Sequence, residues 1–248
     1  MKKKILVALG GNAILKHREK GTAEEQFYNV HEACSHLVEL VEAHDRMILT
    51  HGNGPQVGDI LLQNEISRHL LPPMPLDVCG AESQGMIGYM IQQSMLNVLQ
   101  KAGIHASVVT LLTQTLVSRD DPAFLHPGKP VGPFYTAMEA AKLRSERGWT
   151  IVNDSGRGFR RVVPSPRPLA IIEEEAIKNA FDAGAIVIAG GGGGIPVVKD
   201  KKGNLWGVEA VIDKDHAAAL IATLVGAEIL LILTDIEKVA LNYRKLDE

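Results

Sequence analysis

The strongest constraint on the fold is an alternation of short apolar runs with longer helix-like stretches. The apolar runs are rich in Val, Ile and Leu and occupy residues 5–9, 47–50, 105–112, 185–189 and 228–233. Runs with so little polar alternation are typical of strands buried on both faces of a parallel sheet. Helix-like patterns lie between them, at residues 24–43, 57–70, 83–102, 170–183 and 215–225. The alternation predicts an α/β fold, a three-layer α/β/α sandwich with a mainly parallel central sheet.

One segment, residues 119–168, interrupts this alternation. Its basic cluster consists of Arg157, Arg160, Arg161 and Arg167, and its prolines are Pro122, Pro127, Pro130, Pro133, Pro164, Pro166 and Pro168. Proline at this density disfavours a continuous helix or a central strand. We interpret the segment as a lid or a small protruding subdomain, inserted within a single domain that spans residues 1–248.

Charge and cysteine content exclude several classes of protein. A formal net charge of −3 gives no electrostatic basis for binding nucleic acid or an anionic membrane. Two cysteines, Cys34 and Cys79, do not make a disulfide framework. The apolar run at residues 5–9 is too short for a signal peptide, and no uninterrupted apolar stretch reaches membrane-spanning length. We therefore expect a soluble cytoplasmic protein that binds neither nucleic acid nor membrane.

Glycine gathers where the predicted strands end. Gly10-Gly11-Asn12 follows the first strand, Gly52-Asn53-Gly54 follows the second, and residues 190–194 are all glycine after a later one. Ligands of open α/β sheets bind outside the carboxyl ends of the strands. Glycine lets the backbone approach a ligand closely, and successive N–H groups can cradle phosphate oxygens. Each segment alone could be a tight turn, but three at one sheet edge favour a phosphate site.

Common alternative motifs fit poorly. The P-loop pattern G-x-x-x-x-G-K-[ST] is absent, and Ile195-Pro196 follows the glycine run where a dinucleotide-binding motif needs another glycine and a helix. Ser155 and Ser165 lack the G-x-S-x-G setting of a hydrolase nucleophile. His31 and His36 would lie about 140° apart around a helix, so they could not share a zinc ion. No protein-ligated metal site is predicted.

Several sequence blocks, taken together, resemble the carbamate kinases of the amino-acid-kinase family. They include ALGGNA, HGNGPQVG, SQGMIGY, KPVGP, RRVVPSP and VEAVIDKD, occur in family order and cover nearly the whole chain. Each block is modest alone, but the set is highly specific. The resemblance implies the amino-acid-kinase fold and reversible phosphoryl transfer between ATP and carbamate. The main direction expected is carbamoyl phosphate plus ADP to ATP plus carbamate, which breaks down to ammonia and carbon dioxide.

The same resemblance implies roles for individual residues. Lys214 contacts the transferred phosphoryl group, Asp215 holds the lysines in place, and Lys129 reaches in from the proline-rich segment. The residues that the resemblance assigns to phosphate and carbamate binding are Gly10, Gly11, Asn12, Gly52, Asn53, Gly54, Gly191, Gly192, Gly193 and Gly194. Nucleotide binding falls to Asp213, Thr234, Asp235 and Tyr243. Lysine suits phosphoryl transfer because it is a mobile point charge.

Simpler interpretations of the same residues are open. Lys129 by itself reads as a solvated loop lysine. Asp213-Lys214-Asp215 reads as a helix N-terminus capped by an aspartate, which is compatible with a catalytic role. The carbamate kinase pattern favours Lys129 as a catalytic cation, because the first strand reads Val7-Ala8-Leu9 where many amino-acid kinases carry a lysine.

The resemblance also implies partners and a length. Magnesium is expected on the phosphates of ATP or ADP, held by phosphate and water. The helix at residues 83–102 is expected to contribute to a homodimer. The family normally continues for several tens of residues with a glycine–serine–methionine–x–proline–lysine motif, so we expect this chain to lack that C-terminal segment. Two alternatives follow: a non-catalytic remnant that binds nucleotide or carbamoyl phosphate, and a related small-molecule kinase with another acceptor.

Overall fold

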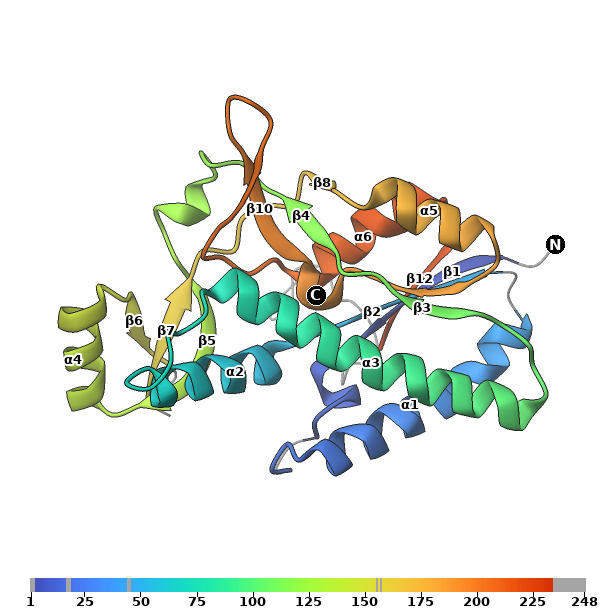
Figure 1. The fold of residues 1–248 in the computed structure, drawn as a ribbon, viewed down its shortest axis with the longest axis horizontal. Helices are drawn as coiled ribbons and strands as arrows, with labels where there is room; N and C mark the ends of the chain where they lie inside the picture. Colours follow the sequence, from blue (N-terminus) through green and yellow to red (C-terminus); the bar gives the residue numbers. More distant parts are fainter. Residues whose placement is uncertain (1–2, 17–18, 44–45, 155, 157, 234–248) are drawn as a thin grey trace, which may run out of the picture.

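The main sheet of the protein is parallel and five-stranded. The computed structural model describes residues 3–16, 19–43, 46–154, 156 and 158–233. Strand order in the main sheet is β12-β1-β2-β9-β3, and every neighbouring pair is parallel (Figure 1). The bounds are β1 Lys4–Leu9, β2 Arg46–His51, β3 Val108–Thr110, β9 Ile186–Ile188 and β12 Ile229–Leu233. These strands lie at the predicted apolar runs, so the predicted α/β class with a parallel central sheet is confirmed.

Helices cover both faces of this sheet and make it the middle of three layers. Alternate residues of β1 point to opposite faces, with Val7 in one hydrophobic cluster and Leu6 in another. The Val7 side is covered by α1 and α3, and the Leu6 side by α5 and α6, which contributes Ile221. The helix bounds are α1 Ala23–Ala43, α3 Leu76–Ala102, α5 Glu174–Asp182 and α6 Lys214–Val225.

A second sheet of mixed direction continues from the first. Its order is β11-β10-β4-β8. The glycine run joins the two sheets, because β9 leads through the short helix η3 (Gly191–Gly193) directly into β10. The strand bounds are β4 Gln114–Leu116, β8 Ala170–Ile171, β10 Ile195–Lys199 and β11 Leu205–Gly207.

A small antiparallel sheet, β5-β7-β6, lies within residues 119–168. Its prolines, Pro130 and Pro133, lie on the edge strand β5, where a missing N–H donor costs no ladder bond. Val57 of α2 and Val131 of β5 share one buried cluster, and in Figure 1 α2 runs beside this sheet. That the segment acts as a lid stays a prediction. The element bounds are α2 Gly54–Ser67, η2 Pro122–Phe124, β5 Lys129–Tyr135, α4 Ala137–Arg147, β6 Ile151–Asn153 and β7 Phe159–Val163.

Several predicted helix boundaries are wrong. The second helix begins at Gly54, because Pro55 fits a first helical turn, where its missing N–H has no partner to lose. The third begins at Leu76 after Pro75, with Gly80 and Gly85 tolerated inside a helix that is buried along much of its length. The pattern at residues 170–183 divides into β8 and α5. No helix in the described part of the chain has the length and apolarity needed to cross a membrane.

Candidate active site

The glycine-rich segments meet at the carboxyl ends of the parallel strands. The N–H of Gly52 donates to Leu9 O at 3.0 Å, and the N–H of Gly10 donates to Leu233 O at 3.0 Å. A pocket of about 320 Å³ opens beside them. Nine residues predicted from the sequence line it: Gly11, Gly52, Asn53, Gly54, Lys129, Gly192, Asp213, Lys214 and Asp215. The strand ends, the proline-rich segment and the start of α6 thus form one site.

Asp213 ties Lys129 to the start of α6. Lys129 is the first residue of β5, and its Nζ donates to Asp213 Oδ2 at 3.0 Å. Asp213 Oδ1 accepts the backbone N–H of Asp215 at 3.0 Å and so caps the helix. Burial raises the pKa of Asp213, but the hydrogen bond and positive charge of Lys129 outweigh burial and leave this pKa below its usual value. Asp213 is therefore an ionised carboxylate at neutral pH.

Lys214 supplies the second cation of the pocket. It is the first residue of α6, and its Nζ donates to Asp215 Oδ1 at 2.6 Å. Its Cδ lies 3.6 Å from the point where a Cβ on Gly52 would be, so its stem runs along the glycine segment after β2. The N-terminus of a helix adds partial positive charge at the same place. Two ammonium groups and a helix N-terminus suit the binding of a phosphate dianion.

The glycine run fits its surroundings only as glycine. A Cβ on Gly191 would meet the imidazole of His51, and one on Gly192 would meet the side chain of Asn53. On Gly193 it would lie 2.6 Å from Ile212 O, in the segment that leads to Asp213. Backbone therefore packs directly against the groups that line the pocket.

Three buried threonines anchor this run, and none of them was predicted from the sequence. Thr50 Oγ1 donates to Gly190 O at 2.9 Å, and Thr115 Oγ1 donates to Gly193 O at 2.8 Å. Thr113 Oγ1 accepts the N–H of Gly190 at 2.9 Å. All three side chains are buried. Hydroxyl side chains at the ends of apolar runs were the available signal, because a buried hydroxyl needs a partner.

Known proteins share this architecture. The Amino acid kinase family matches residues 3–248 of the chain. The chain belongs to this family. The carbamate kinase of Thermococcus kodakarensis is 49% identical over 249 residues, which cover 99% of this chain and 79% of that protein. That of Pyrococcus horikoshii is 50% identical over 245 residues, or 98% of this chain and 78% of the relative.

A solved structure agrees with these relatives. The structure of carbamate kinase from Giardia lamblia bound to AMP-PNP matches with a TM-score of 0.90 at 47% sequence identity. The match covers 99% of this chain and 78% of that one. The resemblance to carbamate kinases and the amino-acid-kinase fold, both predicted from the sequence blocks, are therefore confirmed.

The remaining predicted residues either do not line the pocket or lie outside the described part of the chain. The carbonyl of Gly10 accepts the N–H of Ala13, which forms the turn after β1, and Asn12 falls within the short helix η1 (Gly11–Ala13). Three predicted glycines of the run are not part of the pocket lining: Gly191 packs against His51, Gly193 against Ile212, and Gly194 against Thr115. The predicted nucleotide-binding residues outside the described residues are Thr234, Asp235 and Tyr243.

His51 is a buried, neutral group beside the glycine segments. It is the last residue of β2, is fully buried, and its Nδ1 lies 2.9 Å from Gly52 O. Burial lowers the pKa of His51 from 6.5 to about 4, although the bond to Gly52 opposes this shift. A neutral imidazole beside Gly191 leaves the positive charge of the site to Lys129 and Lys214.

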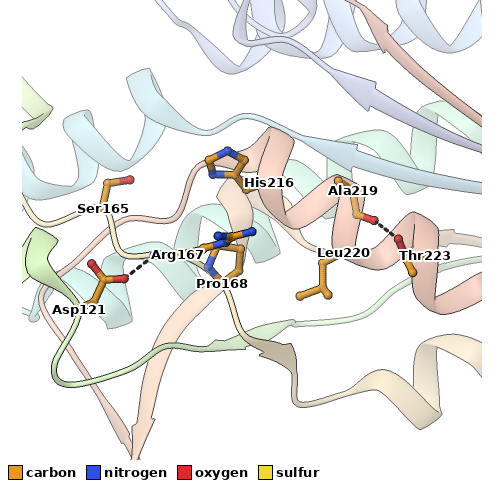
Figure 2. Close-up of a pocket in the computed structure, with 8 residues that line it drawn as sticks. All are labelled: Asp121, Ser165, Arg167, Pro168, His216, Ala219, Leu220 and Thr223. Atoms are coloured by element: carbon orange, nitrogen blue, oxygen red, sulfur yellow. Dashed lines mark hydrogen bonds between the residues drawn. The ribbon is translucent and has the colours of Figure 1, made fainter.

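A larger pocket lies along α6, outside this site. It has a volume of about 670 Å³, and Figure 2 shows Arg167 next to His216, with Leu220 and Thr223 further along α6. Asp121 Oδ2 accepts the backbone N–H of Arg167 at 3.0 Å and so ties together the two ends of residues 119–168. Neither a lysine nor one of the predicted site residues is among its described lining. Size alone therefore does not identify the phosphoryl site.

Proposed function

We propose that this chain is a carbamate kinase, which transfers a phosphoryl group between carbamoyl phosphate and ADP to give carbamate and ATP. The observation that carries the proposal is the pocket where Lys129 and Lys214, from distant segments, face the glycine-rich strand ends. Similarity to carbamate kinases at 47–50% identity supports carbamate as the acceptor. A volume of about 320 Å³ suits a small phosphorylated substrate.

The chemistry asks for positioning and charge stabilisation. Phosphoryl transfer spreads negative charge over the oxygens of the moving group, and Lys129 and Lys214 supply positive charge on its path. Carbamate and the terminal phosphate of ADP already carry anionic oxygens, so neither nucleophile needs a general base. A neutral, buried His51 is compatible with that requirement.

Each lysine has its own carboxylate. Asp213 holds Lys129 and Asp215 holds Lys214, which limits the rotamers that the two long side chains adopt. The backbone N–H groups after β1, β2 and β9 then receive phosphate and carbamate oxygens. We assign this binding role to the predicted glycines, Asn12 and Asn53.

Magnesium enters with the nucleotide as part of the substrate. The two carboxylates that line the described pocket, Asp213 and Asp215, already face lysines. We therefore propose that Mg²⁺ is held by phosphate oxygens and water. Nucleotide binding is assigned to Asp213 together with Thr234, Asp235 and Tyr243.

Three wider assignments belong to this proposal. Residues 119–168 form a protruding subdomain that carries Lys129 over the substrates. A homodimer uses α3, supported by the exposed side chains of Tyr89 and Leu96 on that helix. A cytoplasmic setting is supported by Cys34 and Cys79, which are both buried free thiols.

The test is ATP formation from carbamoyl phosphate and ADP with Mg²⁺, using this chain and its Lys214→Ala variant. ATP from the parent and little from the variant is the expected result. ADP binding without turnover would replace the proposal with a non-catalytic binding protein. Turnover only with another phosphoryl acceptor would replace carbamate as the substrate.

A further inference from the structure

Arg161 is a charged residue buried in the middle of the small sheet. It lies on the central strand β7, opposite Val131 of β5 and Ile151 of β6, and only 7% of its surface is exposed. Its guanidinium carbon lies 4.4 Å from the ring centre of Trp149. A buried guanidinium is costly unless an anion and a stacking partner compensate it, so this position is strongly determined.

The anion that compensates Arg161 comes from another part of the protein. Arg161 Nη2 donates to Glu209 Oε2 at 2.5 Å. Glu209 lies in the segment between β11 and α6, which continues to Asp213 and Lys214. The N–H of Val211 in that segment donates to Pro164 O at 3.0 Å, so the same stretch is also tied to the end of β7.

These contacts join the two segments that present the lysines. Lys129 on β5 lies opposite Val163, and Arg161 on β7 lies opposite Val131. Arg161 and Lys129 therefore belong to one pair of hydrogen-bonded strands. Glu209 precedes Lys214 in the segment that enters α6. A shift of the small sheet away from Glu209 would carry Lys129 away from Asp213 and Lys214.

We propose that Arg161 is a positioning residue, which through Glu209 sets the place of Lys129 relative to Lys214. The inference rests on the proposed function, because the two lysines matter together only in phosphoryl transfer. It goes beyond that function in assigning a role in turnover to a side chain that does not line the pocket of the lysines.

A second ion pair offers a matched control. Arg147 Nη2 lies 3.2 Å from Glu65 Oε1 and ties α4 of the same subdomain to α2. Arg147 lies at the end of α4 rather than in the ladder with Lys129. Its loss loosens the subdomain without directly releasing the strand that carries the lysine.

The test compares Arg161→Gln, Arg161→Lys, Glu209→Gln and Arg147→Gln. A displaced catalytic group of about 1 Å costs up to roughly 100-fold, so we expect kcat to fall by about 10- to 100-fold in Arg161→Gln and Glu209→Gln. We expect the KM for ADP to change far less than kcat. The Arg161→Gln/Glu209→Gln double variant should have a kcat no lower than that of either single variant. Arg161→Lys should recover part of kcat. Arg147→Gln should retain near-parental kcat.

A second readout is independent of turnover. Reductive methylation with ¹³C labels the lysines, and the Lys129 signal is assigned with a Lys129→Arg variant. Arg161→Gln should move this signal towards that of a lysine without an ion pair, whereas Arg147→Gln should not. If the parent makes no ATP but the signal moves as expected, the proposed function fails and the positioning role stands.

Two outcomes would overturn the inference. The first is that Arg161→Gln and Arg147→Gln lower the thermal midpoint equally and that Arg161→Gln loses no more kcat than Arg147→Gln. The second is an unmoved Lys129 signal in both Arg161→Gln and Glu209→Gln. Glu209→Gln guards against misfolding, because the Glu209 side chain is 56% exposed and its replacement keeps the same shape.

Discussion

Lys129 Nζ lies 3.0 Å from Asp213 Oδ2, although 84 positions separate the two residues along the chain. The side chains are 44% and 36% exposed, and an ion pair in such a place contributes only about 0–1 kcal/mol to stability. The same carboxylate caps α6 through the N–H of Asp215. The main effect of the ion pair is therefore to orient Lys129 towards the pocket rather than to stabilise the fold.

Replacing Lys214 should remove most of the activity and spare the fold. We expect Lys214→Ala to lower kcat by roughly 100-fold or more, because a cation beside the transferred group is lost. The thermal midpoint should stay within about 2 °C of the parent, since a partly exposed lysine is removed. ATP production and a thermal scan measure both. Lys202→Ala, in the exposed turn between β10 and β11, is the control, and near-normal activity in Lys214→Ala would refute the role.

Lys129 should matter more for turnover than for nucleotide binding. In Lys129→Ala we expect a larger factor lost in kcat than in ADP affinity, because we propose that the ammonium group faces the transferred phosphoryl group. Steady-state kinetics and calorimetric titration with ADP give the two factors. Lys142→Ala, on the exposed face of α4 in the same subdomain, should change neither. A larger loss in affinity than in kcat would move Lys129 to the nucleotide site.

His51 should make the protein sensitive to mild acid. Its pKa falls from 6.5 to about 4 on folding, so between these pH values the unfolded chain binds a proton that the folded protein does not. Stability from this group is present above pH 6.5 and is lost as the pH falls towards 4, by roughly 3 kcal/mol in total. Urea unfolding of the parent and His51→Gln from pH 7.5 to 4.5 measures the difference.

The sign of that difference is the test. The free energy of unfolding of His51→Gln should fall less steeply with acid than that of the parent. His36→Gln, at an exposed histidine of α1, is the control and should follow the parent. Equal slopes for His51→Gln and the parent would contradict the burial of a neutral imidazole.

Gly193 and Gly203 separate backbone strain from crowding. Both glycines have a positive φ, 89° for Gly193 and 86° for Gly203. A Cβ added to Gly193 would lie 2.6 Å from Ile212 O, whereas a Cβ added to Gly203 would have no neighbour within 4 Å. Gly203→Ala should cost about 1–2 kcal/mol of stability and leave kcat intact. Gly193→Ala should cost more and also lower kcat, because Ile212 adjoins Asp213. Urea unfolding and kinetics measure both, and equal effects would mean that crowding is unimportant.

The parts of the fold that could be predicted are those whose local sequence pattern alone indicates the structure. The strands at residues 5–9, 47–50 and 185–189 were recognisable because burial on both faces makes them uniformly apolar. Strand β4 was missed, since its three residues are fixed by partners far along the chain, β8 and β10. Strand β11, three residues that pair with the neighbouring β10, was missed as well. The start of α3 at Leu76 was also missed, because its glycines weaken the local helix signal while tertiary packing supplies the stability.

The candidate site likewise has parts that the sequence pattern indicates and parts that depend on tertiary packing. Glycine at strand ends and the Asp213-Lys214-Asp215 stretch were visible as patterns, and the pocket contains members of each. The bond between Lys129 and Asp213 was not visible, because it depends on how the small sheet packs against α2. The threonines at the ends of apolar runs were visible in the sequence, but their partners were not, since a hydroxyl does not reveal which group it will bond.

The anchored glycine run does not need to move when substrates bind or products leave. With its carbonyls held by Thr50 and Thr115 and with neighbours on every side, the run is a fixed corner between two sheets rather than a flap. Binding then loses little conformational entropy there, and no loop opening at this corner limits the rate of product release. If substrates need a gate, we expect it in the proline-rich segment that carries Lys129, whose role as a lid stays a prediction.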